Sequence, residues 1–150
     1  MPHLYDNKYC FIRDLGEGGF GKVFLAKEET SNRFVAIKQL LKLDEAKQAW
    51  IVHEIQQLSK LNHQHIVTYY HHFIQDNLLY IVMEYCSKGS LREICSLVTV
   101  SPTSIMQWII ALADTLQYMH DQKIIHHDIK PDNILFTENG EFNFKVHHLK

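Results

Sequence analysis

A run of closely spaced glycines with a strand pattern on either side is the feature that most constrains how this chain can fold. Residues 8–17 alternate apolar and polar side chains, and a second strand pattern begins at Val23. The glycines between the two patterns are Gly16, Gly18 and Gly21. Glycine lets a backbone approach a ligand closely, and unobstructed amide groups bind phosphate well. The spacing Gly-x-Gly-x-x-Gly-x-Val therefore predicts a hairpin whose glycine-rich turn binds phosphate groups.

Glycines at this spacing also occur in dinucleotide-binding folds, where they connect a strand to a helix. In this chain the segment Val23-Phe24-Leu25 continues as a strand. The context therefore favours the hairpin over the dinucleotide-binding alternative.

The rest of the first half predicts an antiparallel sheet with one helix. Phe34–Leu40 is a third strand, and it contains Val35-Ala36-Ile37-Lys38. Apolar residues at helical spacing predict a helix over Asp44–Leu61. The residues expected on its apolar face are Ala46, Trp50, Ile51, Ile55, Leu58 and Leu61. Ile66–Phe73 and Leu78–Glu84 are two further strands, which makes five in all.

The second half predicts helices followed by a small hairpin. Ser90, with Glu93 three residues later, forms a capping-box pattern that begins a short helix. Ser101-Pro102 begins a long helix. The residues expected on the apolar face of this helix are Ile105, Trp108, Ile109, Leu112, Leu116 and Met119. Two short strands, Ile134–Thr137 and Phe142–Val146, are expected around an intervening turn.

Composition limits the classes of function. The 150 residues, 46% of them hydrophobic, suffice for one globular domain with a core. The formal net charge of -2 gives no electrostatic reason to expect nucleic acid or an acidic membrane as a partner. No apolar run is long enough to span a bilayer, and the first residues lack a signal-peptide pattern. The three cysteines, without metal-ligand spacing, indicate reduced thiols, so we expect a cytoplasmic protein, with the nucleus as the alternative.

A third motif, His126-His127-Asp128-Ile129-Lys130-Pro131-Asp132-Asn133, lies in the loop before the two short strands. It follows the glycine run, the Val35–Lys38 strand and a glutamate, Glu54, in the first helix pattern. In this order the motifs resemble those of the protein kinase family, and the resemblance extends from Tyr9 to Val146. Within the family the chain is similar to serine/threonine kinases of the NIMA-related type.

The resemblance implies an α+β, protein-kinase-like fold. It comprises a five-stranded antiparallel N-lobe with its αC helix, followed by the first part of a helical C-lobe. Residues 1–150 then form a truncated kinase domain. Its expected parts are an N-lobe over 9–84, a hinge over 85–89, a partial C-lobe over 90–146 and an atypical tail over 147–150.

The same resemblance implies a nucleotide site for ATP. The residues of the phosphate-covering loop are Leu15, Gly16, Glu17, Gly18, Gly19, Phe20, Gly21 and Val23. Lys38 would bind the α- and β-phosphates, and Glu54 would hold its ammonium group in place. Ala36 and Val23 would lie on one side of the adenine and Leu135 on the other. Met83 would guard the back of the pocket, and the backbones of Glu84 and Cys86 would bond to adenine.

The third motif implies the catalytic residues. Asp128 would be the base that accepts the proton of the substrate hydroxyl. Lys130 would neutralise the transferring phosphoryl group, and lysine here resembles serine/threonine kinases. Asn133 would bind Mg²⁺. The implied activity is ATP-dependent phosphoryl transfer to serine or threonine of a protein substrate, and the sequence gives no indication of the oligomeric state.

Two departures from the family pattern bear on activity. His127 occupies the position of an arginine that pairs with a phosphorylated loop, a role that neutral histidine fills poorly. His148 occupies the position of the Mg²⁺-binding aspartate, and imidazole is a poor ligand for Mg²⁺. We therefore expect phosphoryl transfer by the 150-residue chain to be impaired. We interpret the chain as a fragment, a truncated gene product or a splice form. A nucleotide-binding pseudokinase and a non-catalytic interaction fragment are the alternatives.

Overall fold

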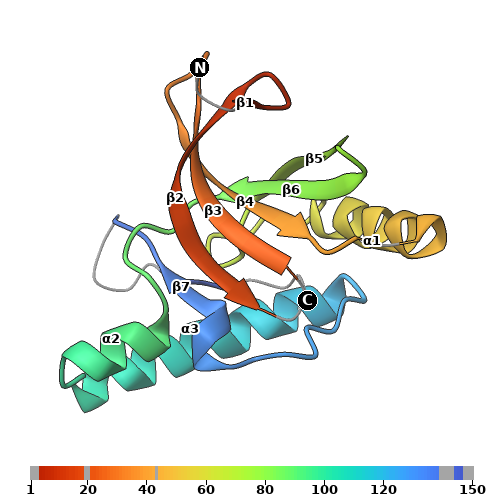
Figure 1. The fold of residues 1–150 in the computed structure, drawn as a ribbon. Helices are drawn as coiled ribbons and strands as arrows, with labels where there is room; N and C mark the ends of the chain where they lie inside the picture. Colours follow the sequence, from red (N-terminus) through yellow and green to blue (C-terminus); the bar gives the residue numbers. More distant parts are fainter. Residues whose placement is uncertain (1–3, 19–20, 43, 139–143, 147–150) are drawn as a thin grey trace. The chain divides into compact units, whose positions relative to one another are not determined.

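The computed structural model describes residues 4–18, 21–42, 44–138 and 144–146 (Figure 1). The chain divides into two compact units. The first contains Met1–Lys60 and Thr68–Tyr85, and the second contains Leu61–Val67 and Cys86–Lys150. In the described ranges, no helix is sufficiently long and apolar to cross a membrane.

The first unit is built on an antiparallel sheet with the strand order β1-β2-β3-β4-β6-β5. The strands are β1 (Leu4–Tyr5), β2 (Tyr9–Gly18), β3 (Gly21–Glu28), β4 (Phe34–Leu40), β5 (Tyr69–Gln75) and β6 (Leu78–Glu84). The five predicted strands are all present. The short strand β1 is an addition that the sequence pattern does not predict, because two residues show no periodicity. It pairs with β2 through a turn in which Asp6 and Asn7 have positive φ.

One predicted strand begins later than expected. The segment Ile66–Phe73 reads as one strand, but β5 starts only at Tyr69. Ile66 and Val67 are almost fully buried, and both belong to the second unit. Ile66 forms an isolated bridge and Val67 belongs to no strand, so their apolar character reflects burial and not a place in β5.

The two faces of the sheet carry different side chains. The buried cluster on one face consists of Tyr9, Phe24, Ala26, Val35, Ile37, Tyr80 and Val82. Register confirms that these residues share a face, since Ile37 lies opposite both Phe24 and Val82. Successive side chains of a strand point to opposite faces. Ala36 and Lys38 of β4 therefore point to the other face, together with Val23 of β3 and Met83 of β6, which lie opposite them.

Helix α1 (Glu45–Leu58) also belongs to the first unit. Asp44 caps it by accepting a hydrogen bond from the Lys47 amide at 2.8 Å. The predicted apolar face is only partly buried, because Ile55 and Leu58 are the buried residues whereas Trp50 is 66% exposed. Helical spacing identifies residues that share a face, but burial also requires a neighbouring element along the whole of that face.

The second unit contains two helices whose beginnings the sequence predicts correctly. Ser90 and Glu93 form the complete capping box of α2 (Leu91–Leu97). Ser101 caps α3 (Pro102–Asp121) by accepting from the Ser104 amide at 3.1 Å. In both cases the side chain satisfies amides that the first helical turn leaves without partners.

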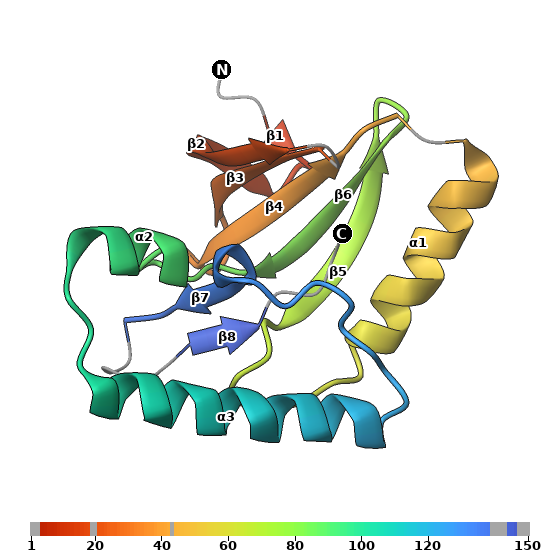
Figure 2. The same ribbon diagram turned by 90° about the horizontal axis from the view of Figure 1, so that it is seen from below.

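The small hairpin of the second unit packs on these helices. The 3₁₀ turn η1 (Pro131–Asn133) leads into β7 (Ile134–Phe136), which pairs with β8 (Phe144–Val146). Figure 2 shows β7 and β8 lying alongside α3. Ile134 and Phe136 form a buried cluster with residues of both helices, namely Leu91, Ile94, Trp108, Ala111 and Leu112.

The predicted apolar face of α3 is only partly correct. Met119 is fully buried and Trp108 packs on Phe136, but Ile105 and Ile109 are exposed. The hairpin strands are also shorter than predicted, since Thr137 lies outside β7. Phe142, where the sequence predicts the start of the second strand, lies outside the described residues.

Candidate active site

The glycine run forms the predicted hairpin of β2 and β3. Gly16 lies opposite Val23, and Gly18 lies opposite Gly21. A Cβ atom added to Gly16 or Gly18 would meet no atom within 4 Å. Both glycines therefore border open space, which a bound group can approach closely. Gly19 and Phe20 of the predicted site lie outside the described residues.

Gly21 has a different reason to be glycine. Its φ is 133°, a backbone conformation that side-chain-bearing residues rarely adopt. A Cβ at this position would overlap the Gln39 carbonyl oxygen of the neighbouring strand β4. The packing of β3 against β4 therefore requires this glycine in the absence of any ligand.

Lys38 lies on the same face as the glycine hairpin. It is opposite Val23 of β3, which is in turn opposite Gly16 of β2. The Lys38 side chain is buried, and desolvation lowers its pKa to about 8, although the charge of Glu54 raises the pKa in part. A buried ammonium group with one carboxylate partner gains stabilisation when a second anion binds.

Two of the residues predicted to lie near adenine, Ala36 and Met83, are on the same face of the sheet as Lys38. Ala36 lies opposite Met83, and both side chains are buried. The Glu84 amide donates to the Thr68 carbonyl at 2.8 Å, and its carboxylate accepts from the Thr68 amide at 3.1 Å. Because the Glu84 amide is already bonded to Thr68, we predict that Glu84 would contribute its carbonyl group to adenine binding.

Other predicted nucleotide-site residues are divided between the two units. Leu15 and Glu17 are exposed on β2. Cys86 begins the second stretch of the second unit; it is buried and is in no disulfide. Leu135, in the middle of β7, is partly buried and forms an isolated bridge with Ser90.

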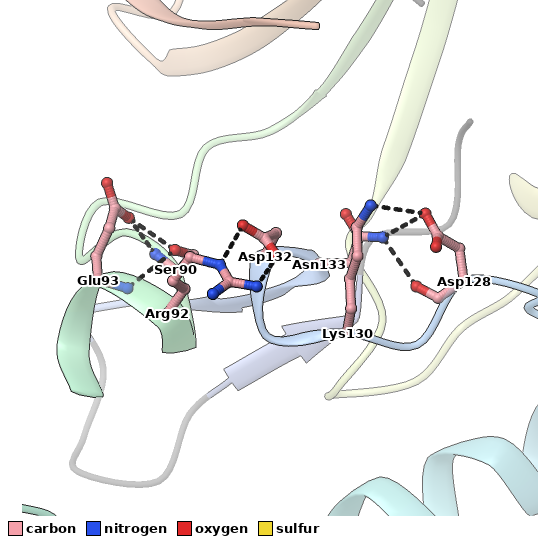
Figure 3. A network of polar contacts seen from close by, with 7 residues as sticks. All are labelled: Ser90, Arg92, Glu93, Asp128, Lys130, Asp132 and Asn133. Carbon is pink, nitrogen blue, oxygen red and sulfur yellow. Dashed lines mark hydrogen bonds and ion pairs between the residues drawn. The ribbon is translucent and has the colours of Figure 1, made fainter. Parts of the chain in front are cut away.

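The predicted catalytic residues come together within the second unit (Figure 3). The Asn133 side-chain amide donates to the Asp128 backbone carbonyl at 2.9 Å and to its carboxylate Oδ2 at 3.0 Å. The Lys130 ammonium lies 3.3 Å from the same Oδ2 atom. These contacts fix the orientation of the carboxylate, which a general base requires.

Two further residues support this segment, and sequence reasoning does not single them out. His126 is buried, and its Nδ1 accepts a hydrogen bond from the Asp128 amide at 3.1 Å. Arg92 of α2 forms a bidentate ion pair with Asp132 at 2.7 and 2.9 Å. His126 could have been suggested by its place in the motif. The Arg92–Asp132 pair joins residues 40 positions apart, and one sequence gives no indication of it.

Comparison of the sequence with models of known protein families agrees with the fold and these motifs. A family model described as "Protein kinase domain" matches residues 9–148. This chain belongs to the protein kinase family. The match covers both the glycine hairpin and the Asp128–Asn133 segment, so the motif assignments rest on one continuous domain pattern.

Among curated relatives of this kinase chain, "Serine/threonine-protein kinase Nek5" of Mus musculus is 36% identical over 137 residues, covering 89% of the chain and 22% of Nek5. The Homo sapiens protein of the same name is 34% identical, covering 89% of the chain and 20% of its own length. "Aurora kinase C" of Mus musculus is 33% identical, covering 97% of the chain and 56% of its own length. The kinase chain thus spans about a fifth of the Nek5 proteins and just over half of Aurora kinase C.

Proposed function

We propose that this protein is a serine/threonine protein kinase, which transfers a phosphoryl group from ATP to a hydroxyl group of a protein substrate. The observation that carries the proposal is the position of the Asp128 carboxylate, which is held by Asn133 and lies 3.3 Å from the Lys130 ammonium. A carboxylate beside a cation is the arrangement that accepts a hydroxyl proton while the cation balances charge on the phosphoryl group.

The described residues fit the nucleotide and its metal ion. Open space at Gly16 and Gly18, on the face that carries the Lys38 ammonium, suits a polyphosphate anion. Asn133 turns its amide nitrogen to Asp128, and its side-chain oxygen is a hard donor of the kind Mg²⁺ prefers. When bound, ATP with Mg²⁺ supplies the phosphoryl group and neutralises its charge.

The roles of the chain's own residues follow from their contacts. The Lys38 ammonium, poorly solvated in its buried position, would bind and orient phosphate oxygens. Asp128 would accept the substrate proton, and Asn133 would hold its carboxylate in line. Lys130 would stabilise negative charge as it develops on the transferred group.

The first prediction is that Asp128→Asn abolishes phosphoryl transfer but leaves nucleotide binding nearly intact. The substitution removes the base while keeping a similar shape, so a fall in kcat of about a thousandfold or more is expected with little change in nucleotide affinity. The test is transfer of radiolabelled phosphate by the full-length protein, with Asp121→Asn in α3 as the matched control. Equal transfer by wild type and Asp128→Asn would remove Asp128 from the proposed role.

The presence of Lys130 leads to a second prediction, on substrate class. We expect a peptide array to be labelled on serine or threonine, as the resemblance of Asp128-x-Lys130 to serine/threonine kinases implies. Labelling confined to tyrosine peptides would refute this assignment.

A nucleotide-binding pseudokinase is a second candidate, because His148 occupies the position of the Mg²⁺-binding aspartate. His148 lies outside the described residues. ATP at a hundred times its Kd stabilises a protein by about 2.7 kcal/mol. Stabilisation by ATP without transfer would identify a pseudokinase, and neither stabilisation nor transfer would identify a non-catalytic interaction protein.

The proposed cellular setting is the cytoplasm, with the nucleus as the alternative. Cys10, Cys86 and Cys95 are in no disulfide, which is the state expected in a reducing compartment. Fluorescence microscopy of the tagged full-length protein tests this, and a purely extracellular or luminal location would contradict it.

A further inference from the structure

The contacts of α2 with the catalytic segment carry an inference that the family motifs do not. Arg92 donates from Nε to Asp132 Oδ1 at 2.7 Å and from Nη2 to Asp132 Oδ2 at 2.9 Å. This is the bidentate fork geometry that gives an arginine–carboxylate pair its directionality. Figure 3 shows the pair next to the contacts that Asn133 makes with Asp128.

Asp132 lies inside the turn that positions Asn133. It is the middle residue of η1, and the turn is closed by the Asn133 amide donating to the Lys130 carbonyl at 2.9 Å. The Asn133 side chain in turn donates a hydrogen bond to the Asp128 carboxylate at 3.0 Å. Fixing Asp132 therefore restricts the turn from which Asn133 reaches Asp128.

Helix α2 is itself anchored to the strand that follows the turn. The Phe136 amide donates to the Gly89 carbonyl at 2.9 Å, and the Lys88 amide donates to the Phe136 carbonyl at 3.0 Å. The Ser90–Glu93 capping box fixes the first turn of α2. The residues just before α2 are thus bonded to Phe136 of β7, which follows η1. Arg92 of α2 in turn binds Asp132 inside η1.

The ion pair lies on the surface, since the side chains of Arg92 and Asp132 are 64% and 44% exposed. An exposed pair has a measurable effect only where its geometry is well defined, as in this bidentate pair, so we expect the effect to be local to η1. We propose that Arg92 is a positioning residue for catalysis, which holds η1 through Asp132 so that Asn133 keeps the Asp128 carboxylate oriented. This proposal rests on the proposed kinase function.

The test is a double-mutant cycle in the full-length protein with Arg92→Met, Asp132→Asn and the two combined. We expect each variant to lower kcat roughly tenfold to a hundredfold, because small misplacement of catalytic groups has effects of this size. The KM for ATP should stay within about twofold, since neither side chain is placed in the nucleotide site. The double variant should be no slower than either single variant, because the effects of residues that act as a pair are not additive.

Two further variants serve as rescue and control. Arg92→Lys should restore part of kcat. Lys47→Met, which removes another exposed cation, should leave kcat unchanged.

A second measurement does not depend on activity. Hydrogen exchange of the peptide that contains Asn133 should be faster in Arg92→Met than in wild type, because the closing bond of η1 opens more often. Unchanged kcat with unchanged exchange would overturn the proposal, as would additive losses in the cycle. Absence of transfer by the wild-type protein would instead refute the kinase function, and the exchange measurement alone would then decide whether Arg92 fixes the turn.

Discussion

At the scale of single residues, burial of Lys38 opposes folding and favours ligand binding at the same time. Its pKa, lowered from 10.5 to about 8, shows that the folded protein holds the charged form at a cost. The charged form predominates in both the folded and unfolded states below pH 8, so the cost is fully present there. It is relieved as the pH rises from 8 towards 10.5. Strongly shifted pKa values are typical of functional sites, and a bound anion would stabilise the charged form of Lys38.

The third prediction follows from this burial. Lys38→Met should raise the stability of the nucleotide-free protein at pH 7 by up to about 3 kcal/mol, the free energy that corresponds to the pKa shift. The advantage over wild type should shrink between pH 8 and 10. Added ATP should stabilise wild type and not the variant. Urea unfolding at several pH values, with and without ATP, measures all three effects, and equal stabilisation of both proteins by ATP would exclude Lys38 from the nucleotide site.

At the scale of elements, the glycines of the β2–β3 hairpin have two different structural roles. Some leave space for a ligand, and one permits the close packing of the sheet. Gly18 borders open space, whereas Gly21 has a positive φ and lies against the backbone of Gln39. The same motif thus combines two physical requirements that its spacing does not distinguish.

The fourth prediction compares these two glycines. Gly21→Ala should destabilise the nucleotide-free protein by roughly 2 kcal/mol or more, because it adds both backbone strain and overlap with β4. Gly18→Ala should change that stability by less than about 1 kcal/mol but weaken ATP binding. Thermal unfolding and nucleotide titration of the two variants provide the comparison. Similar losses of stability in both would show that Gly21 has no special role in the sheet.

At the scale of the whole molecule, one buried carboxylate connects three segments of the first unit. Glu28, at the end of β3, lies 2.7 Å from Lys8 before β2 and 3.4 Å from Arg33 before β4. It also accepts a hydrogen bond from Ser31. The hydrogen bond from Lys8 is the largest cause that lowers the pKa of Glu28 to about 2. Because the folded pKa is lowered, this stabilisation is complete above pH 4.5 and is lost as the pH falls through 2.

The fifth prediction concerns this pH dependence. Glu28→Gln should be less stable than wild type at pH 7, and the difference should disappear as the pH approaches 2. Urea unfolding at pH 7, 4.5, 3 and 2 tests it, with the exposed neighbour Glu29→Gln as the control. A difference that stays constant over this range would mean that the charge of Glu28 is not the stabilising feature.

The sequence by itself determined the features that depend on a few neighbouring residues. The caps at Ser90 and Ser101 bond to residues three positions away, and the glycine hairpin pairs Gly16 with Val23 and Gly18 with Gly21. The motif around Asp128 is also local, since Asn133 reaches it from five positions away. These features were sufficient to predict the fold class, the family and the grouping of Asp128, Lys130 and Asn133.

The features that depend on distant segments of the chain were decided only by the tertiary structure. The burial of Lys38, the overlap that Gly21 avoids with Gln39, and the exposure of Trp50 all depend on which element lies opposite. The Arg92–Asp132 pair joins a helix and a turn that are 40 residues apart. The physical reason is that periodicity and spacing specify local backbone geometry and shared faces. Burial and long-range pairing are set by the packing of the whole chain, which no local pattern encodes.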